Sequence, residues 1–214
     1  MKEFAVIGLG NFGATVAREL SRLKCKVTAI DNDKGRVHSV QDEIHMAILA
    51  DATERDFLQN LEVDKFDCFV VSTGENTHAS ILITLHLKEL GAKRIIVKAK
   101  SDDHAKVLVK VGATQAIIPE KQAAIRIARS ITESNLIDFL PLTGEFYVAE
   151  LAPLARFVGK SLKELKIRTK YNVLIVAVKD AAGKLIFVPG GDYQVKASDI
   201  LLILGEAGNI EQIK

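Results

Sequence analysis

Three glycines near the start of the chain have the spacing of a phosphate-binding loop. Gly8, Gly10 and Gly13 follow the apolar run from Phe4 to Ile7, and apolar residues recur at helical spacing after them. In such a strand-turn-helix unit the first glycine permits the tight turn, the second lets a pyrophosphate reach the backbone, and the third lets the helix pack against the strand. The N–H groups and the dipole at the helix start attract the phosphate.

A carboxylate stands where ribose recognition needs one. A second apolar run, Lys26 to Ile30, ends at Asp31, which lies 23 residues beyond Gly8. That interval is close to the usual one between a glycine loop and the carboxylate that binds the ribose hydroxyls. These features together predict nucleotide binding, and the alternative is a glycine turn that closes an ordinary strand-helix-strand unit. A carboxylate here would also repel a ribose 2′-phosphate, which disfavours NADP.

The elements that position these residues alternate between short apolar strands and amphipathic helices. We expect strands at 2–7, 26–30, 46–49, 67–71, 94–97 and 116–118, and helices at 11–23, 33–41, 54–60, 77–90, 102–111 and 120–133. This alternation predicts an α/β fold, a Rossmann-like doubly wound parallel sheet with right-handed crossovers. Thr53 and Asn76 are expected to cap the third and fourth helices, and Gly112 to end the fifth.

The pattern changes after about Ile137. Shorter strands are expected at 146–151, 172–178, 185–188 and 200–204, with a helix at 162–165 that Ser161 caps and a final helix at 206–213. The sequence therefore predicts a nucleotide-binding domain at 1–136 and a small α+β C-terminal module at 137–214.

The helix expected at 120–133 is apolar on more than one face. Ile127 and Ile131 share one face, Ile125 lies off it, and Leu136 and Ile137 continue the apolar run. This pattern predicts contact with a second copy of the chain, and the alternative is burial within the monomer.

Topology alone gives a candidate site, because ligands of such sheets bind outside the carboxyl ends of the strands. The residues that follow the expected strands are those at 8–13, 31–33, 51–53, 72–76, 98–100 and 120.

Composition limits the classes of function. The net charge of +2 gives no electrostatic case for binding nucleic acid or a membrane surface. No apolar run reaches the roughly 18 residues that a membrane span requires, and the chain opens on its first strand, so we expect no signal peptide. Cys25 and Cys68 lie in or beside expected strands, which favours buried thiols in a reducing cytosol over a disulfide or a metal pair.

The residues of a catalytic site are not evident. None of the three tyrosines has a lysine four residues later, the five histidines are scattered, and no phosphate-binding GxxxxGK[ST] motif occurs. We therefore expect no catalytic residues. An NAD-dependent oxidoreductase with an unrecognised active site is the alternative function.

Several motifs, in order along the chain, resemble the RCK domain, also called the KTN domain, of potassium-uptake regulators. They are GLGNFG at 8–13, ID at 30–31, ADAT at 50–53, STG at 72–74, IVKA at 96–99 and IPE at 118–120. The remainder resembles the C-terminal RCK module through FVGKSL at 157–162 and SDIL at 198–201. The two parts correspond to TrkA-N and TrkA-C modules and cover nearly the whole chain, at the length of a single-copy Ktr-type subunit.

The resemblance implies a cytoplasmic regulatory subunit, peripheral to the inner face of the cell membrane. Such subunits form homodimers and then octameric rings on a separate potassium-translocating integral membrane subunit. An adenine nucleotide (ATP or ADP, or NAD or NADH) would bind at the dimer cleft and gate that partner. This mechanism requires the alternative nucleotides to bind two ring conformations with different affinities.

The resemblance also assigns nucleotide-binding roles to individual positions. These positions are Gly8, Leu9, Gly10, Asn11, Phe12, Gly13, Asp31, Asn32, Asp33, Asp51, Ala52, Thr73, Gly74, Lys98, Lys100, His104 and Glu120. The glycine loop would hold the phosphates, Asp31 the ribose hydroxyls, and Asp51 and Ala52 the adenine. Thr73 and Gly74 would lie against the phosphates or a second ribose.

Three further roles follow from the resemblance, and two of them carry alternatives. Lys98 would provide a positive charge near the ligand. His104 lies where some relatives contact the nucleotide, and the alternative is a surface residue in a first helical turn. Glu120 matches an acidic position that can hold Mg²⁺ or Ca²⁺ near the dimer interface, and the alternative is an ordinary helix start.

One residue departs from the pattern of the ATP-preferring relatives. They often carry an arginine, which reaches the terminal phosphate, where this chain has Asn11. The departure leaves NAD(H) open as the ligand, with Lys98 or Lys100 as a compensating charge for ATP. In some relatives the C-terminal module binds a cyclic dinucleotide between two copies, and Arg168 and Asn172 are the polar candidates here.

Overall fold

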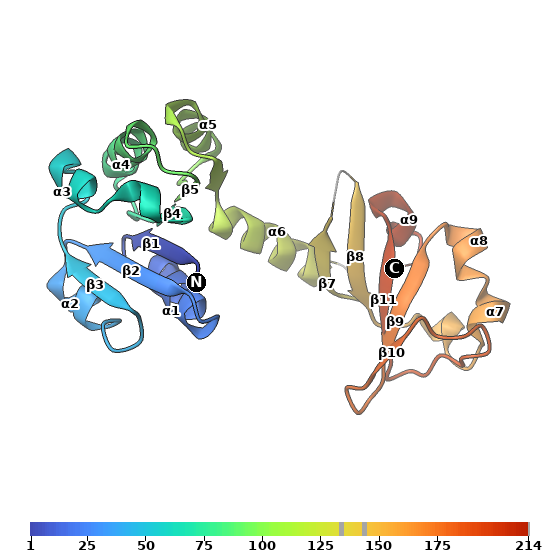
Figure 1. Cartoon of the computed structure of the whole chain (residues 1–214). Coiled ribbons are helices and arrows are strands. Elements are labelled where there is room, and N and C mark those ends of the chain that lie inside the picture. Colours follow the sequence, from blue (N-terminus) through green and yellow to red (C-terminus); the bar gives the residue numbers. More distant parts are fainter. Residues whose placement is uncertain (133–134, 143–144, 214) are drawn as a thin grey trace. The chain divides into compact units, whose positions relative to one another are not determined.

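The computed structural model describes residues 1–132, 135–142 and 145–213. The chain divides into two compact units, Met1–Pro119 and Glu120–Lys214 (Figure 1). The division falls at the start of helix α6 (Pro119–Thr132), whereas the sequence-based boundary at residue 136 falls beyond its end and stays a prediction.

The first unit is built on one six-stranded parallel sheet in the order β3-β2-β1-β4-β5-β6. The strands are β1 (Glu3–Ile7), β2 (Lys26–Asp31), β3 (Met46–Leu49), β4 (Cys68–Val71), β5 (Ile95–Lys98) and β6 (Gln115–Ile117). The helices are α1 (Asn11–Arg22), α2 (Lys34–His38), α3 (Arg55–Asn60), α4 (Thr77–Glu89) and α5 (Asp102–Val111), and a 3₁₀ turn, η1, covers Val63–Lys65. This order confirms the doubly wound, Rossmann-like fold and puts the reversal of strand order between β1 and β4.

Apolar residues fill both faces of this sheet. On one face Val6 and Val27 pack against α1 and α2 through Ala17 and Val37. On the other face α3, α4 and α5 cover a second cluster that includes the fully buried Phe69. Figure 1 shows the two groups of helices on opposite sides of the sheet. Burial on both faces explains why β1 and β4 are continuous apolar runs rather than alternating ones.

The expected caps are formed with one exception. Asn76 accepts the Ala79 N–H at 3.0 Å, and Gly112 ends α5 at φ +124°. Thr53 was expected to cap α3, and this prediction is wrong, because α3 begins one residue later behind Glu54. The Thr53 hydroxyl instead donates to Asp51 at 2.7 Å. This hydrogen bond is charge-assisted, which favours the side-chain orientation toward Asp51.

The second unit is an antiparallel sheet in the order β10-β9-β11-β8-β7. Its strands are β7 (Leu136–Pro141), β8 (Phe146–Leu151), β9 (Leu174–Lys179), β10 (Leu185–Phe187) and β11 (Ile200–Glu206). Besides α6 the helices are α7 (Leu162–Leu165), α8 (Ile167–Tyr171) and α9 (Ala207–Glu211), with a 3₁₀ turn, η2, at Ala155–Phe157. The small α+β module is confirmed. The expected end of α6, Glu133, lies outside the described residues.

The second unit has a core of its own around Leu151, Leu201 and Ile203, each about 1% exposed. Ser161 caps α7 as expected, in a capping box with Glu164. Of the helices that the structure describes, none combines the length and apolar composition needed to cross a bilayer.

Candidate functional site

The backbone of the glycine loop packs closely against Ser72, the residue that follows β4. Gly8 has φ +90°, and a Cβ there would lie 2.1 Å from the Ser72 carbonyl oxygen. A Cβ on Gly13 would lie 1.8 Å from the Gly8 oxygen, so both glycines are required for packing. Gly10 differs, because no atom lies within 4 Å of the place where its Cβ would stand. The free space at Gly10 is what an approaching phosphate requires.

Asp31 is tied to the loop in addition to facing the pocket. Its carboxylate accepts the Leu9 N–H at 2.6 Å and the Asp33 N–H at 2.9 Å. Arg36 lies 3.6 Å from the same oxygen that Leu9 uses. The Asp31 residue is only 6% exposed, so these contacts satisfy a buried charge. Asp31 therefore fixes the turn between β1 and α1 and keeps remaining acceptor capacity for a ligand.

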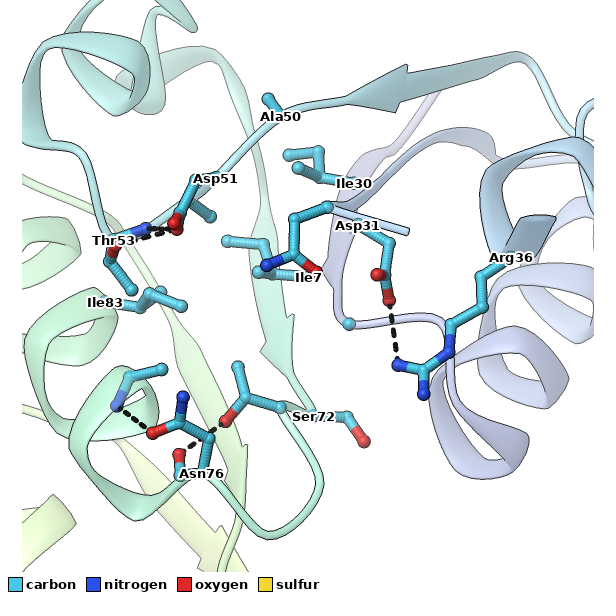
Figure 2. Close-up of a pocket in the computed structure, with 15 residues that line it drawn as sticks. Ile7, Ile30, Asp31, Arg36, Ala50, Asp51, Thr53, Ser72, Asn76 and Ile83 are labelled. Carbon is cyan, nitrogen blue, oxygen red and sulfur yellow. Dashed lines mark hydrogen bonds and ion pairs between the residues drawn. The ribbon is translucent and has the colours of Figure 1, made fainter. Parts of the chain in front are cut away.

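A pocket of about 250 Å³ opens at the carboxyl ends of β1, β2, β3 and β4 (Figure 2). It brings together six positions to which the resemblance assigned nucleotide binding, namely Gly8, Asp31, Asn32, Asp51, Ala52 and Thr73. The other lining residues are Ile7, Ile30, Arg36, Ala50, Thr53, Ser72, Asn76, Ala79 and Ile83. Polar groups provide most of the accessible lining, and Ile7, Ile30 and Ile83 add apolar surface, so the pocket suits a polar ligand.

Asp51 stands in this pocket as a fixed anion. Its Oδ1 accepts the hydroxyl of Thr53 at 2.7 Å and the N–H of Thr53 at 2.9 Å. The side-chain hydrogen bond first, and then the backbone one, lower the pKa of Asp51. The pocket therefore presents a carboxylate that can accept an N–H or O–H group of a ligand across the neutral pH range.

The remaining loop positions lie around the pocket rather than in its wall. Leu9, Gly10 and Asn11 line a neighbouring groove beside α1. Lys98 places its Nζ 5.9 Å from the centre of the Phe12 ring.

Three further positions serve the local structure. Asp33 caps α2 by accepting the Arg36 N–H at 3.0 Å. Lys100 forms an ion pair with Glu75 across the ends of β5 and β4. Gly74 adopts φ +64° with open space beside it. The proposed contacts of these residues with a nucleotide stay predictions.

His104 is a buried residue, so the surface alternative is wrong. Its Nδ1 accepts the Lys100 N–H at 3.1 Å, and its Nε2 lies 3.0 Å from the Ser80 hydroxyl. Because Ser80 donates to the Thr77 carbonyl, the consistent arrangement is a neutral ring with the proton on Nε2. Burial lowers the pKa of His104. The ring orients the start of α5, and its contact with a ligand stays a prediction.

Glu120 lies exposed in the first turn of α6. Within the described part of the chain, no three histidine, cysteine, aspartate or glutamate side chains are grouped as a metal site would require. The metal role of Glu120 stays a prediction.

Sequence reasoning missed Arg36, which contacts Asp31 and lines both the pocket and the groove. The only signal was that it is the nearest arginine after Asp31. Ser72 and Asn76 belong to the stretch 72–76 that topology pointed to, and both line the pocket.

Comparison with known proteins agrees with this architecture. A family model described as the TrkA-N domain matches residues 4–119, and one described as the TrkA-C domain matches residues 146–214. The chain is 41% identical over 214 residues to the Ktr system potassium uptake protein C of Bacillus subtilis (strain 168), covering 100% of this chain and 96% of the relative.

Solved structures share the fold at low sequence identity. The structure titled GsuK Channel aligns with a TM-score of 0.70 and 19% identity, covering 98% of this chain and 38% of the channel chain. The structure titled GsuK channel bound to NAD aligns with a TM-score of 0.53 and 17% identity over 100% of this chain and 38% of the other. The chain thus spans well under half the length of these channel proteins.

Proposed function

The chain belongs to the family of proteins with TrkA-N and TrkA-C domains, and from this premise we propose that it is a nucleotide-binding regulatory subunit of a potassium uptake system. The observation that carries the proposal is the pocket in which Gly8, Asp31 and Asp51 converge, in a chain that matches a potassium uptake protein over its whole length. The oxidoreductase alternative has no comparable support.

The ligand that we propose is an adenine nucleotide, ATP or ADP, or NAD or NADH. The open space at Gly10 suits a phosphate, Asp31 suits a ribose, and the Asp51 carboxylate between Ala50 and Ala52 suits an adenine. The fold shared with a channel solved with NAD supports the same ligand class. Regulation then requires the competing nucleotides to favour different conformations, because equal affinity shifts no equilibrium.

The partner that we propose is a potassium-translocating integral membrane subunit, with this chain on its cytoplasmic side. The chain would act as a homodimer that assembles into a ring. Exposed isoleucines on α6 support the dimer, since Ile125, Ile127 and Ile131 are 44%, 61% and 78% exposed in the single chain. Such apolar surface is typical of a face that a second copy covers.

Two finer proposals concern additional ligands. Glu120 would hold Mg²⁺ or Ca²⁺ together with groups from the nucleotide or the second copy. A cyclic dinucleotide would bind between two C-terminal modules through Arg168, on α8, and Asn172, which ends α8 in a left-handed conformation at φ +53°.

Calorimetric titration of the purified full chain tests the proposal. We expect binding of ATP, ADP, NAD or NADH without turnover, measured with and without a divalent cation. Cation-dependent ATP or ADP binding would support the metal role of Glu120, and cation-independent preference for NADH or NAD would contradict it. Steady hydride transfer to a metabolite, or no binding of any of the four nucleotides, would overturn the proposed function.

A further inference from the structure

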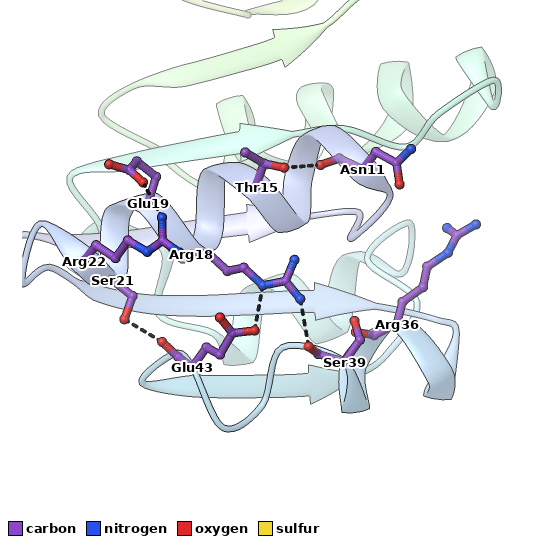
Figure 3. Close-up of polar contacts among 9 residues, drawn as sticks. All are labelled: Asn11, Thr15, Arg18, Glu19, Ser21, Arg22, Arg36, Ser39 and Glu43. Atoms are coloured by element: carbon purple, nitrogen blue, oxygen red, sulfur yellow. Dashed lines mark hydrogen bonds and ion pairs between the residues drawn. The ribbon is translucent and has the colours of Figure 1, made fainter.

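A second groove lies beside the nucleotide pocket and is lined by two arginines. It runs between α1 and α2 and is lined by Leu9, Gly10, Asn11, Ala14, Thr15, Arg18, Arg36 and Ser39. Arg36 also lines the nucleotide pocket, so the two spaces share a wall. Figure 3 shows the Arg36 side chain extending from α2 toward the end of α1 that carries Asn11.

The charge in the groove is positive. None of the described residues that line it is acidic. Arg18 and Arg36 do have carboxylate partners, Glu43 at 2.7 Å and Asp31 at 3.6 Å, but both carboxylates lie outside the lining. The arginines therefore contribute N–H donors to the groove, and their carboxylate partners are not among its lining residues.

Arg18 is positioned in advance, and both arginines keep N–H donors available. Arg18 uses Nε toward Glu43 and Nη2 toward the Ser39 carbonyl at 2.9 Å, which fixes the plane of its guanidinium. A guanidinium carries five N–H donors, so both side chains retain donors after these contacts. Fixed guanidinium planes favour bidentate recognition of a phosphate.

We propose that this groove is a phosphate subsite that receives a phosphate group through Arg36 and Arg18. The inference rests on the proposed function, because Gly10 connects the groove to the open space where a nucleotide phosphate would lie. Asn11 lines the same groove without a charge, and the two arginines supply it instead. The phosphate comes from the 5′ chain of a nucleotide, from its ribose, where Arg36 would offset the repulsion by Asp31, or from free phosphate.

Titration with matched ligands tests this subsite. The probes are AMP, ADP, ATP, adenosine 2′,5′-bisphosphate and inorganic phosphate, each measured with the wild-type chain, Arg36→Gln and Arg18→Gln. Because Arg36 also contacts Asp31, its substitution can change the affinity for every nucleotide. Each variant is therefore judged by a ratio of affinities: ATP to ADP, ADP to AMP, or the bisphosphate to AMP. The control is Arg22→Gln, on the same helix, whose partner is Glu19 and which does not line the groove.

We expect at least one phosphorylated probe to lose about tenfold or more in relative affinity in both groove variants, as removal of a charge-assisted hydrogen bond predicts, and to be unchanged in Arg22→Gln. The probe that responds identifies the source of the phosphate: ATP or ADP for the 5′ chain, the bisphosphate for the ribose, or inorganic phosphate for a free anion. Arg36→Lys, which keeps the charge, should recover part of the loss. Thermal unfolding of each variant checks that the fold is retained.

If nucleotides still bind and these affinity ratios are equal in the wild type and both groove variants, the inference is overturned. If no nucleotide bound at all, the proposed function would fail, and the inorganic phosphate arm alone would decide the subsite. Phosphate binding that Arg36→Gln and Arg18→Gln abolish would support it, and undetectable phosphate binding would overturn it.

Discussion

At the scale of residues, the glycine loop separates positions required by the fold from a position left open for a ligand. Gly8 and Gly13 are closed in by the backbone of Ser72 and of Gly8, whereas Gly10 faces free space. Asp31 then joins the two tasks, since its carboxylate holds the Leu9 N–H and also lines the pocket. Substitutions at Gly8 and Gly13 should therefore lower stability, whereas a substitution at Gly10 should weaken ligand binding.

Gly10→Ala and Gly13→Ala form a matched pair of substitutions. Gly10→Ala should leave the unfolding temperature nearly unchanged and weaken nucleotide binding, because its methyl group meets only the ligand. Gly13→Ala should lower the free energy of unfolding by about 1–3 kcal/mol, because its methyl group collides with the Gly8 carbonyl. Thermal unfolding and calorimetric titration separate the two effects. Unchanged nucleotide affinity in Gly10→Ala would move the phosphate away from the loop.

His104 should make the stability of the first unit depend on pH. Burial lowers the pKa of the folded ring below its ordinary value of 6.5, so the neutral ring is favoured by folding. That stabilisation is complete above about pH 6.5 and is lost as the pH falls toward the lowered pKa.

The measurement is the unfolding temperature of the wild type and of His104→Asn between pH 8 and pH 5. The asparagine keeps an acceptor for the Lys100 N–H but does not titrate. We expect the wild type to lose more stability than the variant below pH 6.5. Parallel curves would show that other groups cause the acid sensitivity.

At the scale of elements, caps decide where short helices begin. In the capping box of α7 the Ser161 hydroxyl accepts the Glu164 N–H, and the Glu164 carboxylate accepts the Ser161 N–H at 2.7 Å. Ser161→Ala should therefore lower the free energy of unfolding by about 1 kcal/mol. Thr169→Ala is the control, because its hydroxyl only donates to the Lys166 carbonyl within a short helix. Denaturant unfolding would detect the difference, and equal losses in both variants would contradict the capping role.

The sequence predicts these elements well where the signal is local. Asn76, Gly112 and Ser161 end or begin helices as expected, because each acts through its own neighbours in the chain. Strand β7 was missed, because Leu136 and Ile137 continue an apolar run that a helix would also explain. Its identity as a strand depends on pairing with β8, from Pro141 opposite Tyr147 to Leu136 opposite Leu151. The distinction between helix and strand was therefore set by tertiary contacts.

The same limit applies to the site. Gly8, Gly10, Gly13 and Asp31 could be found because a fixed spacing encodes their geometry. Arg36 could not, because its importance comes from its contact with Asp31 and from its place beside the glycine loop in the groove. Thr53 offered two local partners, the helix start and Asp51, and the sequence alone does not rank them.

At the scale of the whole molecule, α6 has the surface expected of a dimer contact. Ile127→Glu should shift the chain toward monomers, because burying the introduced carboxylate in an apolar interface is costly. Light scattering gives the mass directly. The control is Val109→Glu on α5, which is 53% exposed, compared with 61% for Ile127. An unchanged mass for Ile127→Glu would show that this face of α6 does not hold the copies together.

The strand order of the second unit has a consequence for synthesis of the chain on the ribosome. The parallel sheet of the first unit is complete once β6 has been made at Ile117, so that unit can fold while translation continues. In the antiparallel sheet the last strand, β11, lies between β9 and β8. A premature stop before Ile200 would therefore remove the middle of that sheet and leave two unpaired edges open to aggregation. For this unit, folding on the nascent chain has to wait until β11 has left the exit tunnel.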